Sequence, residues 1–166
     1  MSYIIIYAQI IVKITKFRGG NILIFRADIE LNNIYELPVK TLVDKGIRLL
    51  LADLDNTMAD YLTEVPNEKV CGWIKALSDS GITLAVVSNN KQERVEKFCK
   101  PLGIDCYWKS GKPSRRTLFA AMEKAGADTT STALIGDKYI TDIMGAKRAG
   151  ILSIKVKPLG KRRLFE

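Results

Sequence analysis

The segment that organises this chain is Arg48-Leu49-Leu50-Leu51-Ala52-Asp53-Leu54-Asp55-Asn56-Thr57, an almost unbroken apolar run that ends in two carboxylates. Such a run is typical of a strand buried on both faces in the middle of a parallel sheet. Side chains alternate along a strand, so Asp53 and Asp55 are expected on one side and Leu54 on the other. The Asn-Thr pair that follows favours a turn. The segment therefore predicts two acids at the carboxyl end of a central strand, where open α/β sheets bind ligands and where a metal ion or a shared proton would relieve their repulsion.

The composition limits the chemistry that the chain can perform. Its 166 residues suffice for one domain with a sizeable core. It has no histidine, which excludes serine–histidine and cysteine–histidine catalysis and most zinc sites. Cys71, Cys99 and Cys106 form no CxxC pair, which favours free thiols in an intracellular compartment, the cytoplasm or an organelle interior. The net charge of +8 favours anionic partners: phosphorylated substrates, nucleic acid or acidic lipid surfaces. A solvated basic surface is the plainer alternative.

The two ends of the chain differ from its middle. Residues 3–12 are apolar and rich in isoleucine, but a run of this length is shorter than the roughly 20 residues that span a bilayer, and no basic region precedes it. An edge strand, a loosely held terminus and a membrane-surface segment all remain open for it. We therefore predict an extension of unknown role over residues 1–21, one domain over 22–158, and a basic tail over 159–166.

Strands and helices alternate in the sequence pattern from residue 47 onward. This alternation is the signature of βαβ units and of a parallel sheet with helices on both faces. Residues 22–37 have a mixed pattern. Further strands are predicted over 82–87, 104–108, 132–135 and 151–156, and helices over 39–45, 66–80, 92–100, 114–125 and 139–149.

Polar residues follow four of these strands. Ser88 closes the second strand, Lys112 lies in the loop before the 114–125 helix, and Asp137 closes the fourth strand with Asp142 five residues further on. The carboxyl ends of parallel strands share one edge of the sheet, so these side chains are expected to meet Asp53 there. Taken singly they are weak signals, because a DxD is often a solvated turn and a serine after a strand is often a helix cap.

Two or more acids, a hydroxyl and a lysine at one edge suit phosphoryl transfer. Asp53 would attack phosphorus and become an aspartyl phosphate, while Asp55 would protonate the leaving oxygen and then take a proton from water. Three acids would hold Mg²⁺, a hard cation that prefers oxygen ligands; they are Asp53, Asp137 and Asp142. Ser88 and Lys112 would hold the phosphoryl oxygens. Neither GxxxxGK[ST] nor GxGxxG occurs.

The residues 53–57, Asp-Leu-Asp-Asn-Thr, resemble the DxDxT signature of haloacid dehalogenase-like (HAD) phosphatases. Ser88 resembles that superfamily's second motif, Lys112-Pro113 its third, and residues 136–142, with the form GDxxxxD, its fourth. The resemblance implies a Rossmann-like sheet of strand order 5-4-1-2-3 and Mg²⁺-dependent hydrolysis through an aspartyl phosphate. It also implies that the backbone carbonyl of Asp55 is a metal ligand and that Asn89 contacts the substrate. Only residues 58–87 separate the first two motifs, which leaves no room for a large cap domain.

Residues 28–158 further resemble the YqeG-like branch of class IIIA, which is similar to mitochondrial phosphatidylglycerophosphate phosphatases. Met58 and Ala27 depart from that branch, where leucine and proline are usual. The implied substrate is phosphatidylglycerophosphate, and an open basic site would suit peripheral contact with an anionic membrane.

Three other functions are weighed against this one. A HAD phosphatase for a soluble sugar or nucleotide would share every motif. A nucleic-acid 3′-phosphatase or nucleic-acid-binding protein would suit the charge, but no aromatic–basic RNA-binding motif is visible. A phospho-receiver signalling module also uses an acid, a hydroxyl and a lysine, but an acid–base group at Asp55 would shorten the life of the phosphoryl group.

Overall fold

The structure, a computed structural model, describes residues 26–160. The predicted extension over 1–21 and the tail beyond Gly160 lie outside the described residues. In the described part, six parallel strands form one sheet in the order β1-β6-β5-β2-β3-β4. The strands are β1 (Ile29–Leu31), β2 (Leu49–Ala52), β3 (Thr83–Val87), β4 (Asp105–Tyr107), β5 (Thr132–Gly136) and β6 (Leu152–Val156).

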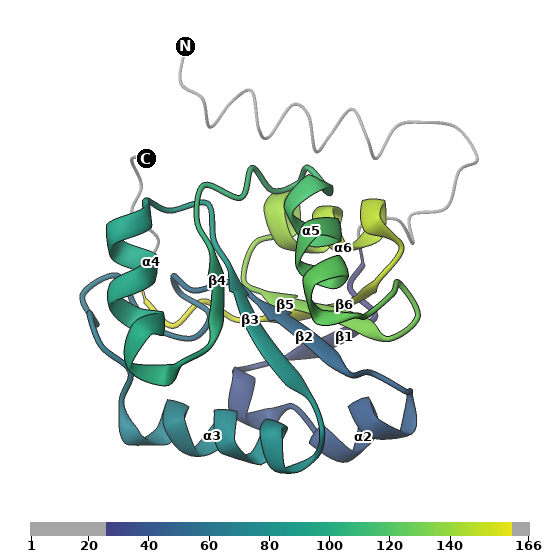
Figure 1. Cartoon of the computed structure of the whole chain (residues 1–166), viewed down its shortest axis with the longest axis horizontal. Helices are drawn as coiled ribbons and strands as arrows, with labels where there is room; N and C mark the ends of the chain where they lie inside the picture. Colours follow the sequence, from purple (N-terminus) through teal and green to yellow (C-terminus); the bar gives the residue numbers. More distant parts are fainter. Residues whose placement is uncertain (1–25, 161–166) are drawn as a thin grey trace.

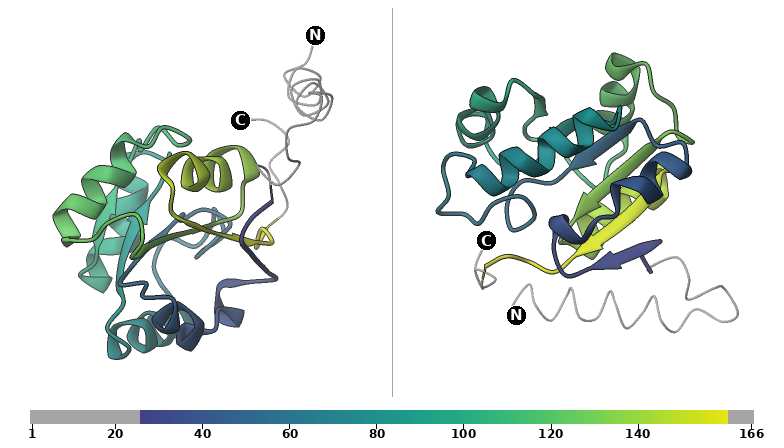
Figure 2. Two further views of the ribbon diagram at one scale, coloured as in Figure 1. Left: turned by 90° about the vertical axis from the view of Figure 1, so that its right-hand side faces the viewer. Right: turned by 90° about the horizontal axis from the view of Figure 1, so that it is seen from below.

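Helices cover both faces of this sheet. Figure 1 shows α5 and α6 on one side of the strands, α2 and α3 on the other, and α4 beside β4. The views in Figure 2 show the same layers from two further sides. The α-helices are α2 (Val39–Asp44), α3 (Glu68–Asp79), α4 (Gln92–Cys99), α5 (Arg116–Ala125) and α6 (Met144–Ala149), with short 3₁₀ turns η2 (Ile34–Glu36) and η3 (Lys100–Leu102) and a π-helical turn η4 (Tyr139–Ile143).

The central strand β2 is buried on both faces, as its apolar run predicts. Leu50 and Ala52 belong to a core cluster that includes residues of α2, α3 and α4. Leu49 and Leu51 belong to a second cluster with residues of α5 and α6. The alternation of side chains along one strand thus supplies both cores. Asn56 ends the run with a φ of 65°, a left-handed conformation that asparagine adopts more readily than most residues.

The predicted strand order is confirmed for five strands, since β6-β5-β2-β3-β4 reads 5-4-1-2-3 along the chain. Residues 22–37, whose sequence pattern is mixed, contain a sixth strand, β1, which lies beside β6. Three residues on a sheet edge are too few to produce a periodic pattern. Asp28 holds this strand in place, since its carboxylate accepts hydrogen bonds from the Ser153 backbone N–H at 2.8 Å and hydroxyl at 2.7 Å.

The connections after β2 and β3 add no further domain at the carboxyl ends of the strands. Residues 88–91 join β3 to α4, and residues 53–67 join β2 to α3. The second connection folds on itself, because Asp60 Oδ1 accepts hydrogen bonds from Leu62 N–H and from both Thr63 N–H and its hydroxyl, at 2.8–2.9 Å. Neither connection forms a large cap, so the carboxyl edge of the sheet stays open, as predicted.

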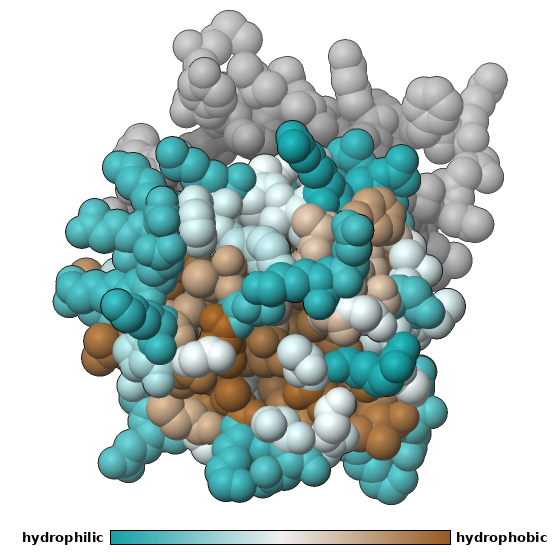
Figure 3. Space-filling model, viewed as in Figure 1, coloured by the Kyte–Doolittle hydropathy of each residue, from teal (hydrophilic) through white to brown (hydrophobic). Residues whose placement is uncertain are grey.

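Helices in the described part of the chain are all too short or too polar to cross a membrane. Figure 3 shows apolar surface gathered across the lower middle of the face seen in Figure 1, with hydrophilic side chains around it. The three cysteines are unpaired: Cys99 is buried, Cys106 half-buried and Cys71 exposed.

Candidate active site

A pocket of about 200 Å³ opens at the carboxyl ends of β2 and β3. Five residues predicted from the sequence line it, and the structure adds four that were not predicted for the site. The lining residues are Asp53, Asp55, Ser88, Asn89 and Lys112 from the prediction, with Tyr61, Asn90, Lys138 and Thr141 added.

Three buried carboxylates gather beside this pocket. Asp53, Asp137 and Asp142 each place an oxygen within 4.8 Å of the other two, although the chain separates the first and last by almost ninety residues. Burial raises the pKa of Asp53 to about 7; nearby Lys112 opposes this rise, and the carboxylates of Asp142 and Asp137 add to it. Burial and the charge of Asp142 also raise the pKa of Asp137.

These raised pKa values have burial as their main cause, and the neighbouring carboxylates add to it. Three hard oxygen donors at this spacing fit a divalent cation such as Mg²⁺, which would remove the repulsion. The fold therefore brings together the three carboxylates that the sequence predicts as metal donors.

A glycine and a wide helical turn bring Asp142 to the cluster. A Cβ on Gly136 would lie 2.3 Å from Asp142 Cγ, so only glycine allows this close approach. Asp142 sits in the π-helical turn η4. Its Oδ2 accepts a hydrogen bond from the Lys138 backbone N–H at 2.9 Å, and its own N–H donates to the Lys138 carbonyl at 2.9 Å. The predicted helix over 139–149 is thus present, but its first turn is wider than an α-helical turn.

Lys112 joins two of the acids. Its Nζ lies 2.9 Å from Asp53 Oδ1 and 2.7 Å from Asp142 Oδ1, and the residue is 4% exposed. Burial alone would lower the pKa of Lys112, but the carboxylates of Asp142 and Asp53 more than offset this and raise it. The lysine is therefore a fixed positive charge at the floor of the pocket.

Asn89 holds the loop that carries Lys112. Its Oδ1 accepts hydrogen bonds from Lys112 N–H at 2.9 Å and from the Ser110 hydroxyl at 2.6 Å, and its Nδ2 donates to the Lys112 carbonyl at 2.9 Å. The side-chain amide is thus occupied by the protein itself, which favours a positioning role over the predicted contact with the substrate.

Ser88 lies at the end of β3 and is 2% exposed. Its Oγ accepts a hydrogen bond from Asn90 N–H at 3.1 Å, and its carbonyl accepts one from Ser110 N–H at 3.0 Å. The hydroxyl therefore remains a potential donor to an anion in the pocket that it lines.

Asp55 is held from two sides. Arg94, in α4, places Nη2 at 3.1 Å and Nε at 3.2 Å from Asp55 Oδ1, and Asn90 Nδ2 donates to Asp55 Oδ2 at 2.7 Å. Arg94 also donates to the Asp60 carbonyl at 3.2 Å. Sequence reasoning missed Arg94, because a single arginine in an otherwise charged helix gives no signal of its own.

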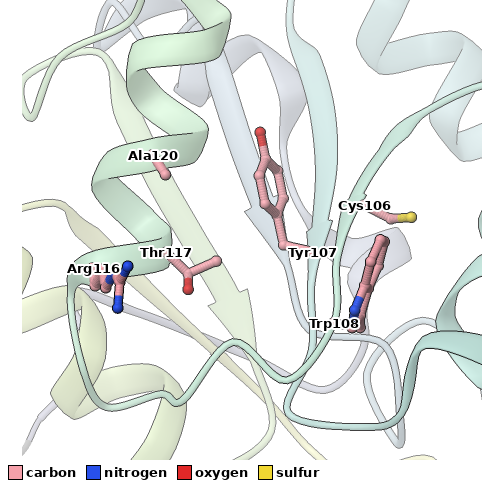
Figure 4. A pocket seen from close by; sticks show the side chains of 6 residues that line it. All are labelled: Cys106, Tyr107, Trp108, Arg116, Thr117 and Ala120. Atoms are coloured by element: carbon pink, nitrogen blue, oxygen red, sulfur yellow. The ribbon is translucent and has the colours of Figure 1, made fainter.

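A second hollow of about 290 Å³ lies between β4 and α5 and contains no carboxylate (Figure 4). Its lining residues are Cys106, Tyr107, Trp108, Arg116, Thr117 and Ala120. Asp53 of the acid cluster lines the first pocket and not this hollow, so the first pocket is the candidate site.

Comparison with known proteins identifies relatives over most of the chain. The family described as haloacid dehalogenase-like hydrolase matches residues 5–150. A Bacillus subtilis protein named "Probable phosphatase YqeG" is 29% identical over 135 residues, which cover 81% of this chain and 78% of that protein. A phosphoglycolate phosphatase from Agrobacterium fabrum is 31% identical over 123 residues, which cover 63% of this chain but only 52% of that enzyme.

Solved structures share the fold. A single mutant of a thermostable NPPase from Geobacillus stearothermophilus superposes with a TM-score of 0.54 at 14% identity, over 73% of this chain and 93% of that one. At this identity the similarity concerns the arrangement of the sheet and helices alone.

Proposed function

The chain belongs to the haloacid dehalogenase-like hydrolase family, and from this premise we propose that it is a Mg²⁺-dependent phosphatase that hydrolyses phosphate monoesters through an aspartyl phosphate. The observation that carries the proposal is the cluster of Asp53, Asp137 and Asp142 beside a pocket with Lys112 at its floor. Bound Mg²⁺ would neutralise charge among these carboxylates and polarise the phosphoryl group.

In the first half-reaction, a carboxylate oxygen of Asp53 attacks phosphorus and the bond to the ester oxygen breaks. Asp55 gives its proton to that oxygen, so the alcohol leaves neutral. Arg94 and Asn90 hold the carboxylate that Asp55 then presents.

In the second half-reaction, Asp55 takes a proton from a water molecule whose oxygen attacks phosphorus. The bond between phosphorus and Asp53 breaks, inorganic phosphate is released, and Asp55 is protonated for the next cycle. Lys112 and the Ser88 hydroxyl would hold phosphoryl oxygens as negative charge moves in both steps.

The substrate that we propose is phosphatidylglycerophosphate at an anionic membrane surface. A site without a large cap admits a bulky headgroup. Leu62 is 83% exposed and Val65 is 55% exposed, so the connection that contributes Tyr61 to the pocket also carries two exposed apolar side chains. With a net charge of +8, basic residues near such a surface would each contribute about 1 kcal/mol to binding.

A soluble phosphate ester is the second candidate. The observation that favours it is the similarity to a phosphoglycolate phosphatase, which at 31% is slightly more identical than the YqeG relative, although over less of the chain.

The test is release of inorganic phosphate from short-chain phosphatidylglycerophosphate, phosphoglycolate, sugar phosphates and nucleotides, each with Mg²⁺ and with EDTA. We expect turnover only with Mg²⁺, and a loss of about 1,000-fold or more for Asp53→Asn because the nucleophile is removed. Full activity of Asp53→Asn would overturn the mechanism. A higher kcat/KM for a soluble ester than for the lipid would overturn the lipid assignment alone.

A further inference from the structure

The two lysines that line the pocket differ in their exposure and in their ion pairs. Lys112 is buried and paired with both Asp53 and Asp142. Lys138 is exposed to solvent, and no ion pair involves it among residues 26–160. The second lysine therefore carries a positive charge that the acid cluster does not neutralise by direct contact.

Hydrogen bonds fix the backbone of Lys138, and its side chain extends toward Tyr61, which also lines the pocket. Its N–H donates to Asp142 Oδ2 at 2.9 Å, and its carbonyl accepts from Asp142 N–H at 2.9 Å and from Ile143 N–H at 3.2 Å. Its Nζ lies 3.5 Å from the hydroxyl of Tyr61, which belongs to the connection after β2. Two segments far apart in the sequence thus bring the ammonium group to the rim of the pocket, above the charges at its floor.

We propose that Lys138, oriented by Tyr61, forms a second anion subsite that binds a negatively charged group of the substrate other than the phosphoryl group under attack. This inference rests on the proposed function and specifies its substrate class: phosphate monoesters with a second anionic group a few bonds away. A carboxylate, a second phosphate and a phosphodiester share this chemistry. An ammonium at a pocket rim recognises each of them as a point charge, without a demand for one geometry.

Matched substrate pairs test the subsite. Glycerol 1-phosphate and glycerol 1,3-bisphosphate differ only in the second phosphate, and 2-hydroxyethyl phosphate and phosphoglycolate differ in a terminal carboxylate. Short-chain phosphatidylglycerophosphate supplies the phosphodiester. The quantity compared is the ratio of kcat/KM between the substrate with the extra anion and its partner, measured with Mg²⁺ and corrected for the two equivalent phosphates of the bisphosphate.

For the wild-type protein we expect a ratio above one for at least one of the anions. The anion that gives this ratio is the chemical group that the subsite binds. In Lys138→Met this ratio should fall about tenfold, the size expected for one charge-assisted contact, and Lys138→Arg should retain most of it. Tyr61→Phe should lower it less, because the cation remains but its orientation is lost. Lys75→Met removes the same charge from an exposed site in α3 and should leave the ratio unchanged.

A ratio near one in the wild type, or a ratio that survives Lys138→Met, would overturn the subsite. So would an equal loss for both members of a pair, because the lysine would then serve the transferred phosphoryl group. These results would leave the proposed phosphatase activity standing. Failure of the wild-type protein to release phosphate from any ester would overturn the proposed function itself.

Discussion

At the scale of single residues, the carboxylate of Asp55 receives donors on both of its oxygens, from Arg94 and from Asn90. The motif pattern indicates an acid at this position, but it says nothing of the groups that aim it. Those donors come from the β3–α4 connection and from α4, and their approach depends on how the helix packs. The sequence could therefore predict the reacting groups, but not Arg94 and Asn90, which hold Asp55 in place.

Replacing Arg94 tests the importance of this support. In Arg94→Met, Asp55 loses a charged partner at 3.1 Å, and we expect kcat to fall about 100-fold while KM changes little, because small displacements of an acid–base group are costly. Arg94→Lys should recover part of the rate. Arg148→Met, an exposed position in α6, is the control. A normal kcat in Arg94→Met would show that Asp55 is positioned without the arginine.

Gly136 offers a second test at this scale. In Gly136→Ala the new methyl group would meet Asp142 at 2.3 Å and force its carboxylate away from Lys112. We expect a loss of about 1–3 kcal/mol in the free energy of unfolding and a clear drop in Mg²⁺ affinity by isothermal titration calorimetry. Gly72→Ala, in α3 with open space around its Cα, should instead gain up to about 1 kcal/mol. Unaltered Mg²⁺ binding in Gly136→Ala would contradict the role of this close approach.

At the scale of elements, periodicity was sufficient for every long helix and for the five strands of the predicted order. It failed for β1, a three-residue edge strand, and for the π-helical form of η4. Both depend on contacts with distant residues: Asp28 with Ser153 for the strand, and Asp142 with Lys112 for the turn. The local pattern of apolar and polar residues does not reveal contacts between distant residues, so these two features could not be predicted.

Asn89 ties the end of β3 to the loop before α5 through three hydrogen bonds. In Asn89→Ala we expect lower stability by about 1–3 kcal/mol and a reduced kcat, with KM nearly unchanged, because the Lys112 loop loses its anchor. Asn67→Ala removes the N-cap of α3 and should cost about 1 kcal/mol without altering kcat. A large rise in KM for Asn89→Ala would instead support the contact with substrate that the sequence suggested.

At the scale of the whole molecule, the acid cluster makes the stability of the fold depend on pH and on bound Mg²⁺. The pKa of Asp53 is raised to about 7 in the folded protein, so the folded protein holds this proton more tightly than the unfolded chain. The metal-free protein should therefore lose stability as the pH rises from about 4 to about 7, and Mg²⁺ should restore more of it at pH 8 than at pH 6.

Thermal unfolding at a series of pH values, with Mg²⁺ and with EDTA, measures this link. Asp53→Asn isolates the group: its Tm in EDTA should depend less on pH, and at pH 8 it should exceed that of the wild type. Equal pH dependence in the two proteins would show that Asp53 does not ionise in this range.

The open edge of the sheet also affects how each catalytic cycle is timed. Because the connections after β2 and β3 form no large cap, the described fold contains no large domain whose movement must precede or follow chemistry. Ester and free phosphate can then enter and leave without waiting for a domain to move. Adding a viscogen such as sucrose should lower kcat/KM by no more than the factor by which it slows diffusion of the substrate to the protein. The value of kcat should hardly change.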